Sequence, residues 1–224
     1  MSLLDWRHVP LMFVDDLDQP ELDPADHHHF ARVRRVSDGD SIIISDGCGR
    51  WRPARFGLRP TADGELCEEP PPKHPLTVGF TPVKAERPEW VVQKLTELGV
   101  DVIVPLQADR SVVRWDAEKF EKNRSKWSVI VREAAMQSRR VRLPHIEDLT
   151  PVSAVPTDVG TVLADPAGRP LQTTDHTVLI GPEGGWSEAE RSAREVRSLP
   201  GGILRAETAA LVAAALLADQ RSRL

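Results

Sequence analysis

The 224-residue chain has few cysteines and no long apolar run, and each of these absences excludes a class of protein. Its two cysteines, Cys48 and Cys67, do not have the spacing of a metal site or a redox pair, so we expect free thiols in a reduced compartment. No apolar run approaches the roughly 20 residues that span a bilayer. The first residues also lack the basic start and apolar stretch of a secretory signal. We therefore predict a cytoplasmic protein without a membrane partner.

The chain also lacks an excess of positive charge, since its net charge is −5 at pH 7. This value argues against a nucleic-acid partner, but the charges are unevenly distributed. Residues 1–26 carry seven acidic residues and one arginine, whereas residues 110–142 carry ten Lys or Arg and four acidic residues. Exposed charges are screened beyond about 8 Å at physiological ionic strength, so a polyanion senses the local patch. An RNA partner remains compatible with the sequence.

Four prolines within residues 65–75 predict an extended connector between two domains. Upstream, short apolar segments alternate with Asp-Gly pairs, a turn signal, so residues 1–72 are expected to form a small β-rich domain. The segments expected to be extended are residues 31–36, 41–45 and 51–58.

Residues 73–224 alternate between strand-like and helix-like patterns, which predicts an α/β domain with a mostly parallel sheet. The expected strands are residues 76–80, 100–106, 160–164 and 177–180. The expected helices are residues 88–99, 116–138, one that begins at Ser187 and one that includes 211–217. The fold class is therefore a small β domain joined to an α/β domain.

The segment Leu-Ile-Gly-Pro-Glu-Gly-Gly at residues 179–185 lies between a predicted strand and a helix that opens with the Ser187–Glu190 capping box. In open α/β sheets ligands bind at the carboxyl ends of strands, where glycines let the backbone approach them. A tight turn would also use Gly and Pro, and the segment alone does not decide between the two readings. It matches neither the P-loop nor the G-x-G-x-x-G fingerprint.

The segment Ile-Leu-Arg-Ala-Glu-Thr-Ala at residues 203–209 places polar residues before an apolar helix. An ordinary helix start explains Glu207 beside the positive end of the dipole and Thr208 as a cap. It does not explain Arg205, because a cation at that end is unfavourable unless an anion approaches. The pattern therefore indicates an anionic ligand or transition state near Arg205.

Together these two segments resemble the ribosomal RNA small-subunit methyltransferase E family of the SPOUT superfamily. Further matches are Lys-Ala-Glu-Arg-Pro-Glu-Trp at residues 84–90, Gln-Lys-Leu-Thr-Glu-Leu-Gly-Val at residues 93–100 and Arg-Ser-Val-Val at residues 110–113. The other matches are Glu-Ala-Ala-Met-Gln-Ser-Arg-Arg at residues 133–140, His-His-Phe-Ala-Arg-Val-Arg-Arg-Val at residues 28–36 and Gly-Asp at residues 39–40. The order and spacing of these matches over nearly the whole chain make the resemblance specific.

The resemblance implies a PUA-like β-barrel in residues 1–72 and a SPOUT domain with a deep trefoil knot in residues 73–224. It also implies a homodimer that uses S-adenosyl-L-methionine, without a metal, to methylate N3 of a uridine in small-subunit (16S) ribosomal RNA, free or within the 30S subunit. The residues expected to bind the cofactor are Leu179, Ile180, Gly181, Pro182, Glu183, Gly184, Gly185, Leu199, Ile203, Leu204, Arg205, Thr208 and Ala209. The family often has a basic residue before Ile-Leu-Arg, whereas this chain has Leu-Pro-Gly-Gly at residues 199–202, so we expect a more mobile loop there.

For the chemistry we expect Arg205 to stabilise the uracil anion and Glu183 or Glu207 to accept the N3 proton. The residues expected to contact RNA are His29, Arg32, Arg34, Arg35, Lys84, Arg110, Arg139 and Arg140. Trp51 could add a base-stacking face. We expect the three histidines at residues 27–29 to lie on a strand, where neighbouring side chains point to opposite faces, so a metal site is disfavoured.

Three other readings remain open. The chain could be a catalytically idle RNA-binding ribosome-assembly factor, or a related knotted methyltransferase that acts on transfer RNA. The glycine segment could instead bind a nucleotide phosphate, although residues 179–210 contain no lysine.

Overall fold

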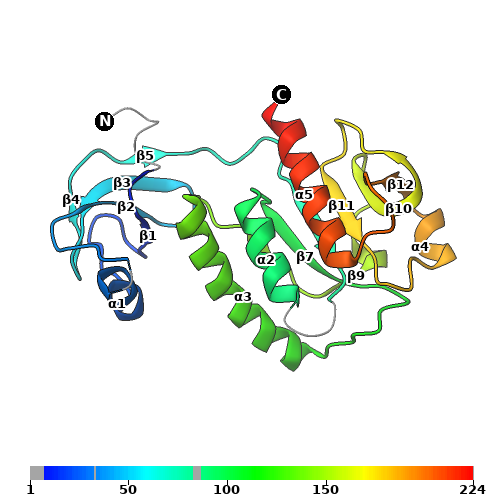
Figure 1. Ribbon diagram of the computed structural model, residues 1–224, viewed down its shortest axis with the longest axis horizontal. Helices are drawn as coiled ribbons and strands as arrows, with labels where there is room; N and C mark the ends of the chain where they lie inside the picture. The colour runs from blue at the N-terminus through cyan, green and yellow to red at the C-terminus, as the bar shows by residue number, and fades with distance from the viewer. Residues whose placement is uncertain (1–7, 33, 83–86, 224) are drawn as a thin grey trace. The chain divides into compact units, whose positions relative to one another are not determined.

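The computed structural model describes residues 8–32, 34–82 and 87–223. Its backbone contacts divide the chain into two compact units (Figure 1). The first unit consists of the described residues up to Pro72 together with Arg132–Leu143, and the second consists of Lys73–Val131 and Pro144–Leu224. The sequence analysis placed 132–143 in the second domain. This segment packs with the first because Ala135, Met136 and Val141 are buried in the apolar core of the first unit.

The first unit contains a small mixed sheet in the order β1-β2-β3-β4, with β5 paired to β3. β1 is parallel to β2, and the other pairs are antiparallel. The predicted turn at Asp46-Gly47 joins β2 to β3. There the Asp46 carboxylate accepts the backbone N–H groups of Cys48 and Arg50, and Gly47 adopts a φ of +74°. The strands are β1 (Leu11–Phe13), β2 (Ser41–Ser45), β3 (Arg50–Arg55), β4 (Thr61–Ala62) and β5 (Cys67–Glu68).

A helix stands where the sequence analysis expected extended chain. The three histidines lie in α1 (Pro24–Arg32), so the strand expected for them is wrong, and so is the one expected for residues 31–36. The Asp23 carboxylate accepts the N–H of Ala25 at 2.8 Å, a contact typical of a helix N-cap. Phe30 then anchors the helix in the core.

The second unit contains the mostly parallel sheet that the sequence predicts. Its order is β12-β10-β11-β6-β7-β8, with β9 paired to β7, and the registered pairs are parallel throughout. The strands are β6 (Thr77–Phe80), β7 (Val102–Gln107), β8 (His145–Ile146), β9 (Thr150–Pro151), β10 (Thr161–Pro170), β11 (Thr177–Ile180) and β12 (Glu195–Ser198). The strands β8, β9 and β12 and the second half of β10 were not predicted from the sequence.

Helices connect these strands. They are α2 (Arg87–Glu97), α3 (Ala117–Ser138), the 3-10 helix η2 (Val152–Ala154), α4 (Glu188–Ser192) and α5 (Ala206–Ser222). At the expected start of the helix 116–138, the Asp116 carboxylate accepts the N–H of Lys119 and caps α3. At the expected end of the helix 88–99, Gly99 has a φ of +86°. α5, whose buried residues are mostly alanines, packs on β6, β11 and α2. Figure 1 shows this helix beside α2 and β11. In the described part of the chain, no helix is long and apolar enough to cross a membrane.

Candidate functional site

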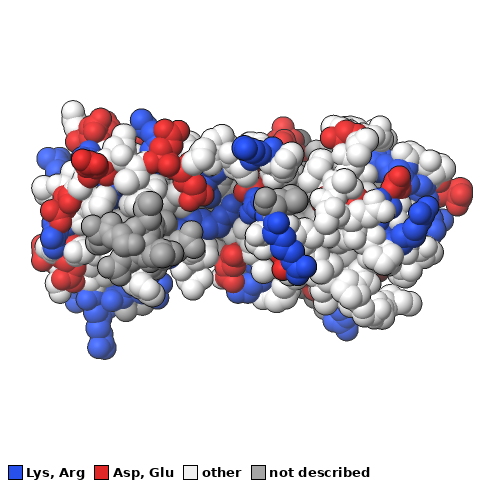
Figure 2. Space-filling model, turned by 90° about the horizontal axis from the view of Figure 1, so that it is seen from above, with Lys and Arg blue, Asp and Glu red and all other residues white. Residues whose placement is uncertain are grey.

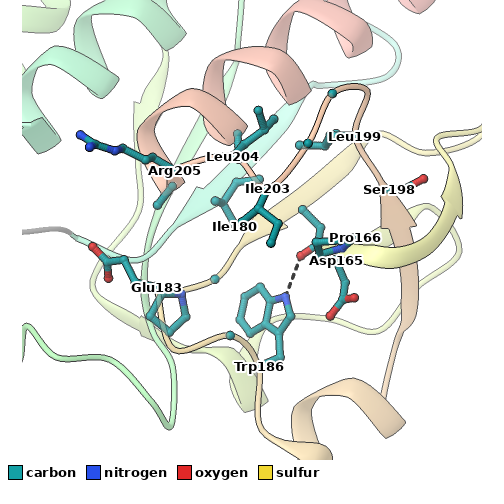
Figure 3. A pocket seen from close by; sticks show the side chains of 18 of the residues that line it. Asp165, Pro166, Ile180, Glu183, Trp186, Ser198, Leu199, Ile203, Leu204 and Arg205 are labelled. Carbon is teal, nitrogen blue, oxygen red and sulfur yellow. Dashed lines mark hydrogen bonds between the residues drawn. The ribbon is translucent and has the colours of Figure 1, made fainter.

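A cavity of about 820 Å³ lies at the carboxyl ends of β11 and β12, beside the middle of β10 (Figure 3). This volume is within the range of small-molecule sites, and the position agrees with the rule for ligands in open parallel sheets. Its walls come from the turn after β11, from the segment between β12 and α5, and from an irregular part of β10. The two motif segments that are separate in the sequence are therefore two walls of one cavity.

The turn after β11 depends on a glycine beside a tryptophan. The side chain of Trp186 is 4% exposed, and its indole Nε1–H donates to the carbonyl oxygen of Ala164 at 2.9 Å (Figure 3). A Cβ atom at Gly181 would lie 2.9 Å from the Trp186 ring, closer than real Cβ contacts allow. The glycine is therefore required because the turn folds back onto its own tryptophan.

The helix that closes the cavity begins with Arg205 as its N-cap residue, whose side chain makes no capping hydrogen bond. Thr208 lies inside the first turn, so the alternative reading of Thr208 as an ordinary helix cap is wrong. The side chains of Arg205 and Glu183 are exposed and lie on the same side of the cavity, away from Asp165 and Ser198 (Figure 3). A cation and a carboxylate thus stand near the positive end of α5.

Most residues expected to bind the cofactor line this cavity. Those that line it are Ile180, Gly181, Pro182, Glu183, Gly185, Leu199, Ile203, Leu204, Arg205 and Ala209. Three others do not. Leu179 is fully buried in the core, and Thr208 is exposed on α5. Gly184 faces Arg110, since a Cβ atom added to it would lie 3.5 Å from the Cβ atom of Arg110. Glu207, the alternative proton acceptor, is half-buried in the first turn of α5 and is also outside the lining.

The sequence analysis missed one wall of the cavity. Residues 164–166 belong to a bulge where the register of β10 shifts between Ala164 and Arg169. The side chain of Asp165 is 10% exposed, and its carboxylate pairs with Arg191 of α4 at 2.9 Å. The turn-like sequence Asp-Pro-Ala-Gly, which interrupts the strand, was an available signal. The other unpredicted lining residues are Trp186, Ser198, Pro200, Gly201, Gly202 and Ala206.

The loop that departs from the family pattern forms the outer wall. Gly201 adopts a φ of +103°, a conformation that favours glycine. The following Ile203 is 93% exposed although it lines the cavity (Figure 3). An apolar side chain so exposed at a cavity wall is suited to contact a ligand.

The expected RNA contacts fall on both units. His29, Arg32, Arg34 and Arg35 are exposed in the first unit, and Arg139 and Arg140 are half-buried in the same unit. Arg110 is exposed just beyond β7 in the second unit, where its guanidinium donates to the carbonyl oxygen of Gly184 at 3.3 Å. Lys84 lies outside the described residues.

Tertiary structure brings two of these arginines close enough to repel each other. Burial lowers the pKa of Arg139, and the charge of Arg34 lowers it further. The backbone of Arg139 is also in the left-handed region, with a φ of +61°. Two cations held near each other favour an anion such as a phosphate.

One expectation about the surface is changed by the structure. Trp51 is only 6% exposed, so its ring is part of the core and does not offer a face to a base. On the face drawn in Figure 2, basic and acidic side chains are interspersed over the described residues. Among those residues, no group of three or more His, Cys, Asp or Glu side chains is placed to hold a metal ion.

Comparison with protein families gives two matches. The model of an RNA methyltransferase domain matches residues 69–218, and the model of an RNA methyltransferase PUA domain matches residues 22–56. The first match contains the whole cavity, and the second contains α1, β2 and β3.

Individual proteins agree with these matches over nearly the full length. The ribosomal RNA small subunit methyltransferase E of Mycobacterium tuberculosis is 32% identical over 91% of this chain and 88% of its own. The structure of a "probable rRNA-methyltransferase" from Porphyromonas gingivalis superposes with a TM-score of 0.80 at 25% identity, over 96% of this chain and 99% of the other. A Legionella pneumophila protein assigned as a methyltransferase, solved with bound SAM, gives a TM-score of 0.75 at 27% identity, over 93% and 96% of the two chains.

Proposed function

Because the chain belongs to the ribosomal RNA small subunit methyltransferase E family, we propose that it transfers a methyl group from S-adenosyl-L-methionine to N3 of a uridine in small-subunit (16S) ribosomal RNA. The observation that carries the proposal is the cavity in which the segments 179–185 and 203–209 meet. The related Legionella structure contains SAM, which supports this choice of cofactor.

The residues of the cavity fit such a cofactor. Apolar side chains, among them Ile180, Leu199 and Leu204, offer surfaces for the adenine and the thioether chain. The glycine segment offers backbone N–H and C=O groups to the polar parts. When bound, S-adenosyl-L-methionine supplies an electrophilic methyl group on a sulfonium sulfur.

The chain itself must bind the uridine and manage its proton. The N3 atom of uracil can accept a methyl group only as its proton leaves, and negative charge then spreads over the ring. Arg205, exposed at the start of α5, is placed to stabilise that charge. Glu183 on the same side of the cavity, or Glu207 in the first turn of α5, accepts the proton.

The proposal extends to the finer architecture and the partners. Residues 1–72 would form a PUA-like barrel that binds RNA, and residues 73–224 a SPOUT domain with a trefoil knot. Family membership supports both, as it supports a homodimer in the cytoplasm whose substrate is free RNA or the assembled 30S subunit.

The test is to incubate the protein with radiolabelled S-adenosyl-L-methionine and separated small-subunit ribosomal RNA or transfer RNA. We expect label in the ribosomal RNA. Mass spectrometry should find one N3-methyluridine in the small-subunit RNA of the wild-type strain, and this nucleotide should be unmethylated in a strain without the gene. Label in transfer RNA would indicate the related tRNA enzyme. RNA binding without any cofactor binding in calorimetry would indicate an idle assembly factor.

A further inference from the structure

A closed cluster of hydrogen bonds lies beside the cofactor cavity, formed by Asp109, Ser187 and Glu190. Glu190 is only 7% exposed. Its Oε2 atom accepts the backbone N–H of Ser187 at 2.8 Å, and its Oε1 atom accepts the backbone N–H of Asp109 at 3.0 Å. The Ser187 hydroxyl accepts the N–H of Glu190 at 3.2 Å and donates to Asp109 Oδ2 at 2.6 Å. Both carboxylate oxygens of Glu190 therefore have a backbone partner.

Helix capping explains only half of this cluster. The capping box accounts for the reciprocal bonds between Ser187 and Glu190 at the start of α4. It does not account for the two bonds to Asp109, which is far away in the sequence and follows β7. A helix cap alone requires neither a contact with Asp109 nor a Glu190 carboxylate whose two oxygens both accept hydrogen bonds.

The cluster joins two segments of the proposed active site. Ser187 directly follows Trp186 and the glycine segment, while Asp109 directly precedes Arg110. The Arg110 guanidinium donates in turn to the carbonyl oxygen of Gly184 at 3.3 Å. The residues from Gly184 to Ser187 are thus held at both ends by the loop that leaves β7.

These bonds are of a kind that fixes geometry. Hydrogen bonds from backbone N–H groups to an ionised carboxylate are stronger than neutral ones. Breaking one of them leaves a buried polar group without its partner, which destabilises the conformation that the bond holds. A site that recognises its ligand through backbone atoms works only when the supporting contacts hold that backbone in place.

We propose that Glu190 is a positioning residue that holds the glycine segment in its cofactor-binding conformation by tying it to the loop after β7. This inference rests on the proposed function for the identity of the ligand. The tie itself is a property of the chain and can be tested without any ligand.

The test compares Glu190→Gln with Glu188→Gln, which removes the same charge from an exposed position on the same short helix. Glutamine has one acceptor oxygen and an amide NH₂, so it can keep only one of the two backbone bonds. Hydrogen–deuterium exchange is followed in peptides that cover residues 107–111 and 181–187. We expect faster exchange in both segments for Glu190→Gln and in neither for Glu188→Gln. Faster exchange confined to α4 would overturn the proposal, because it would show a helix cap and nothing more.

Calorimetry with S-adenosyl-L-methionine then connects the tie to the site. We expect Glu190→Gln to weaken cofactor binding about tenfold, which corresponds to the loss of one such bond. Its melting temperature should fall by a few degrees below that of Glu188→Gln, because a buried backbone N–H group loses its partner. Wild-type affinity in Glu190→Gln would overturn the positioning role. If the wild-type protein binds no cofactor, the proposed function fails, while the exchange data still decide whether the tie exists.

A second variant keeps the test decisive if Glu190→Gln does not fold. Ser187→Ala removes the hydroxyl that bonds to Asp109 and leaves both acceptor bonds of Glu190 in place. We expect changes in the same direction and of smaller size in both segments. Fast, unprotected exchange of the Asp109 amide in Ser187→Ala would contradict the proposal, because the bond from that amide to Glu190 would then not hold the loop in place.

Discussion

The indole of Trp186 donates a hydrogen bond to the carbonyl oxygen of Ala164 at 2.9 Å and so links the turn after β11 to the point where β10 becomes irregular (Figure 3). The same ring lies against Gly181. One buried side chain therefore holds two walls of the cavity together, and the glycine segment has its shape because of a residue that follows it.

The first prediction concerns this contact. Gly181→Ala would place a Cβ atom 2.9 Å from a buried, rigid ring, and we expect a loss of about 1–3 kcal/mol in the free energy of unfolding. Cofactor binding should weaken as well, because the turn must shift. Denaturant unfolding and calorimetry measure the two effects. Gly202→Ala is the matched control, since nothing lies within 4 Å of a Cβ atom in this other glycine of the cavity wall. Equal stability of the two variants would contradict the prediction.

The second prediction separates chemistry from binding. Arg205→Ala should lower the rate of methyl transfer by about 10²–10³-fold, because it removes a charge directed at the developing anion. The affinity for S-adenosyl-L-methionine should change little, since the cavity keeps its apolar walls and its glycine segment. Single-turnover kinetics and calorimetry measure the two quantities. Arg223→Ala, at the other end of α5 and paired with Asp219, should change neither. If Arg205→Ala kept the wild-type rate of methyl transfer, Arg205 would not stabilise the developing anion.

The third prediction concerns RNA binding by the first unit. Arg32 and Arg34 are exposed there, and replacing both by Ala should weaken RNA binding at low salt. The slope of log K against log salt should become shallower by about 0.7–0.9 for each phosphate that the variant no longer binds. Binding titrations over a range of salt concentrations measure this slope. Arg59→Ala removes an arginine from the same unit whose side chain is 80% exposed, and it should leave the slope unchanged. If the wild type, the double variant and Arg59→Ala all had the same slope, the RNA phosphates would not contact Arg32 and Arg34.

The fourth prediction concerns acid stability. Burial on its own raises the pKa of Asp46, but hydrogen bonds from the Arg50 guanidinium and from the N–H groups of Cys48 and Arg50 outweigh it and bring the pKa below 3.8. A carboxyl whose pKa is lowered by folding stabilises the folded state above its ordinary pKa, and this stabilisation is lost as the pH falls through the folded value. Asp46→Asn should therefore be less stable than wild type near neutral pH, with a difference that shrinks below pH 3.8. Denaturant unfolding at several pH values measures it.

The control for this prediction is Asp38→Asn, which changes an exposed carboxylate in the turn before β2. It should follow the wild-type profile. A constant difference between Asp46→Asn and wild type at every pH would show that the carboxylate acts through its shape and not through its charge.

The sequence predicted well those features that depend on neighbouring residues. The strand β11, the helix start at Asp116, the helix end at Gly99 and the capping box at Ser187 depend on local sequence, and each is present in the structure. Where local signals conflicted, the prediction was wrong. Residues 24–32 form a helix because Asp23 caps it and Phe30 anchors it, although the Asp-Gly turns nearby favoured strands.

The sequence by itself determined the parallel sheet and the two segments that meet in the cavity, because the periodicity and the motifs that carry them lie within short stretches of chain. Only the tertiary structure decided the rest. The register shift in β10 forms the third wall, Glu190 bonds to Asp109 across 81 residues, and residues 132–143 join the core of the first unit. Each of these contacts joins residues distant in the chain, and their free energy depends on burial that exists only after the sheet has formed.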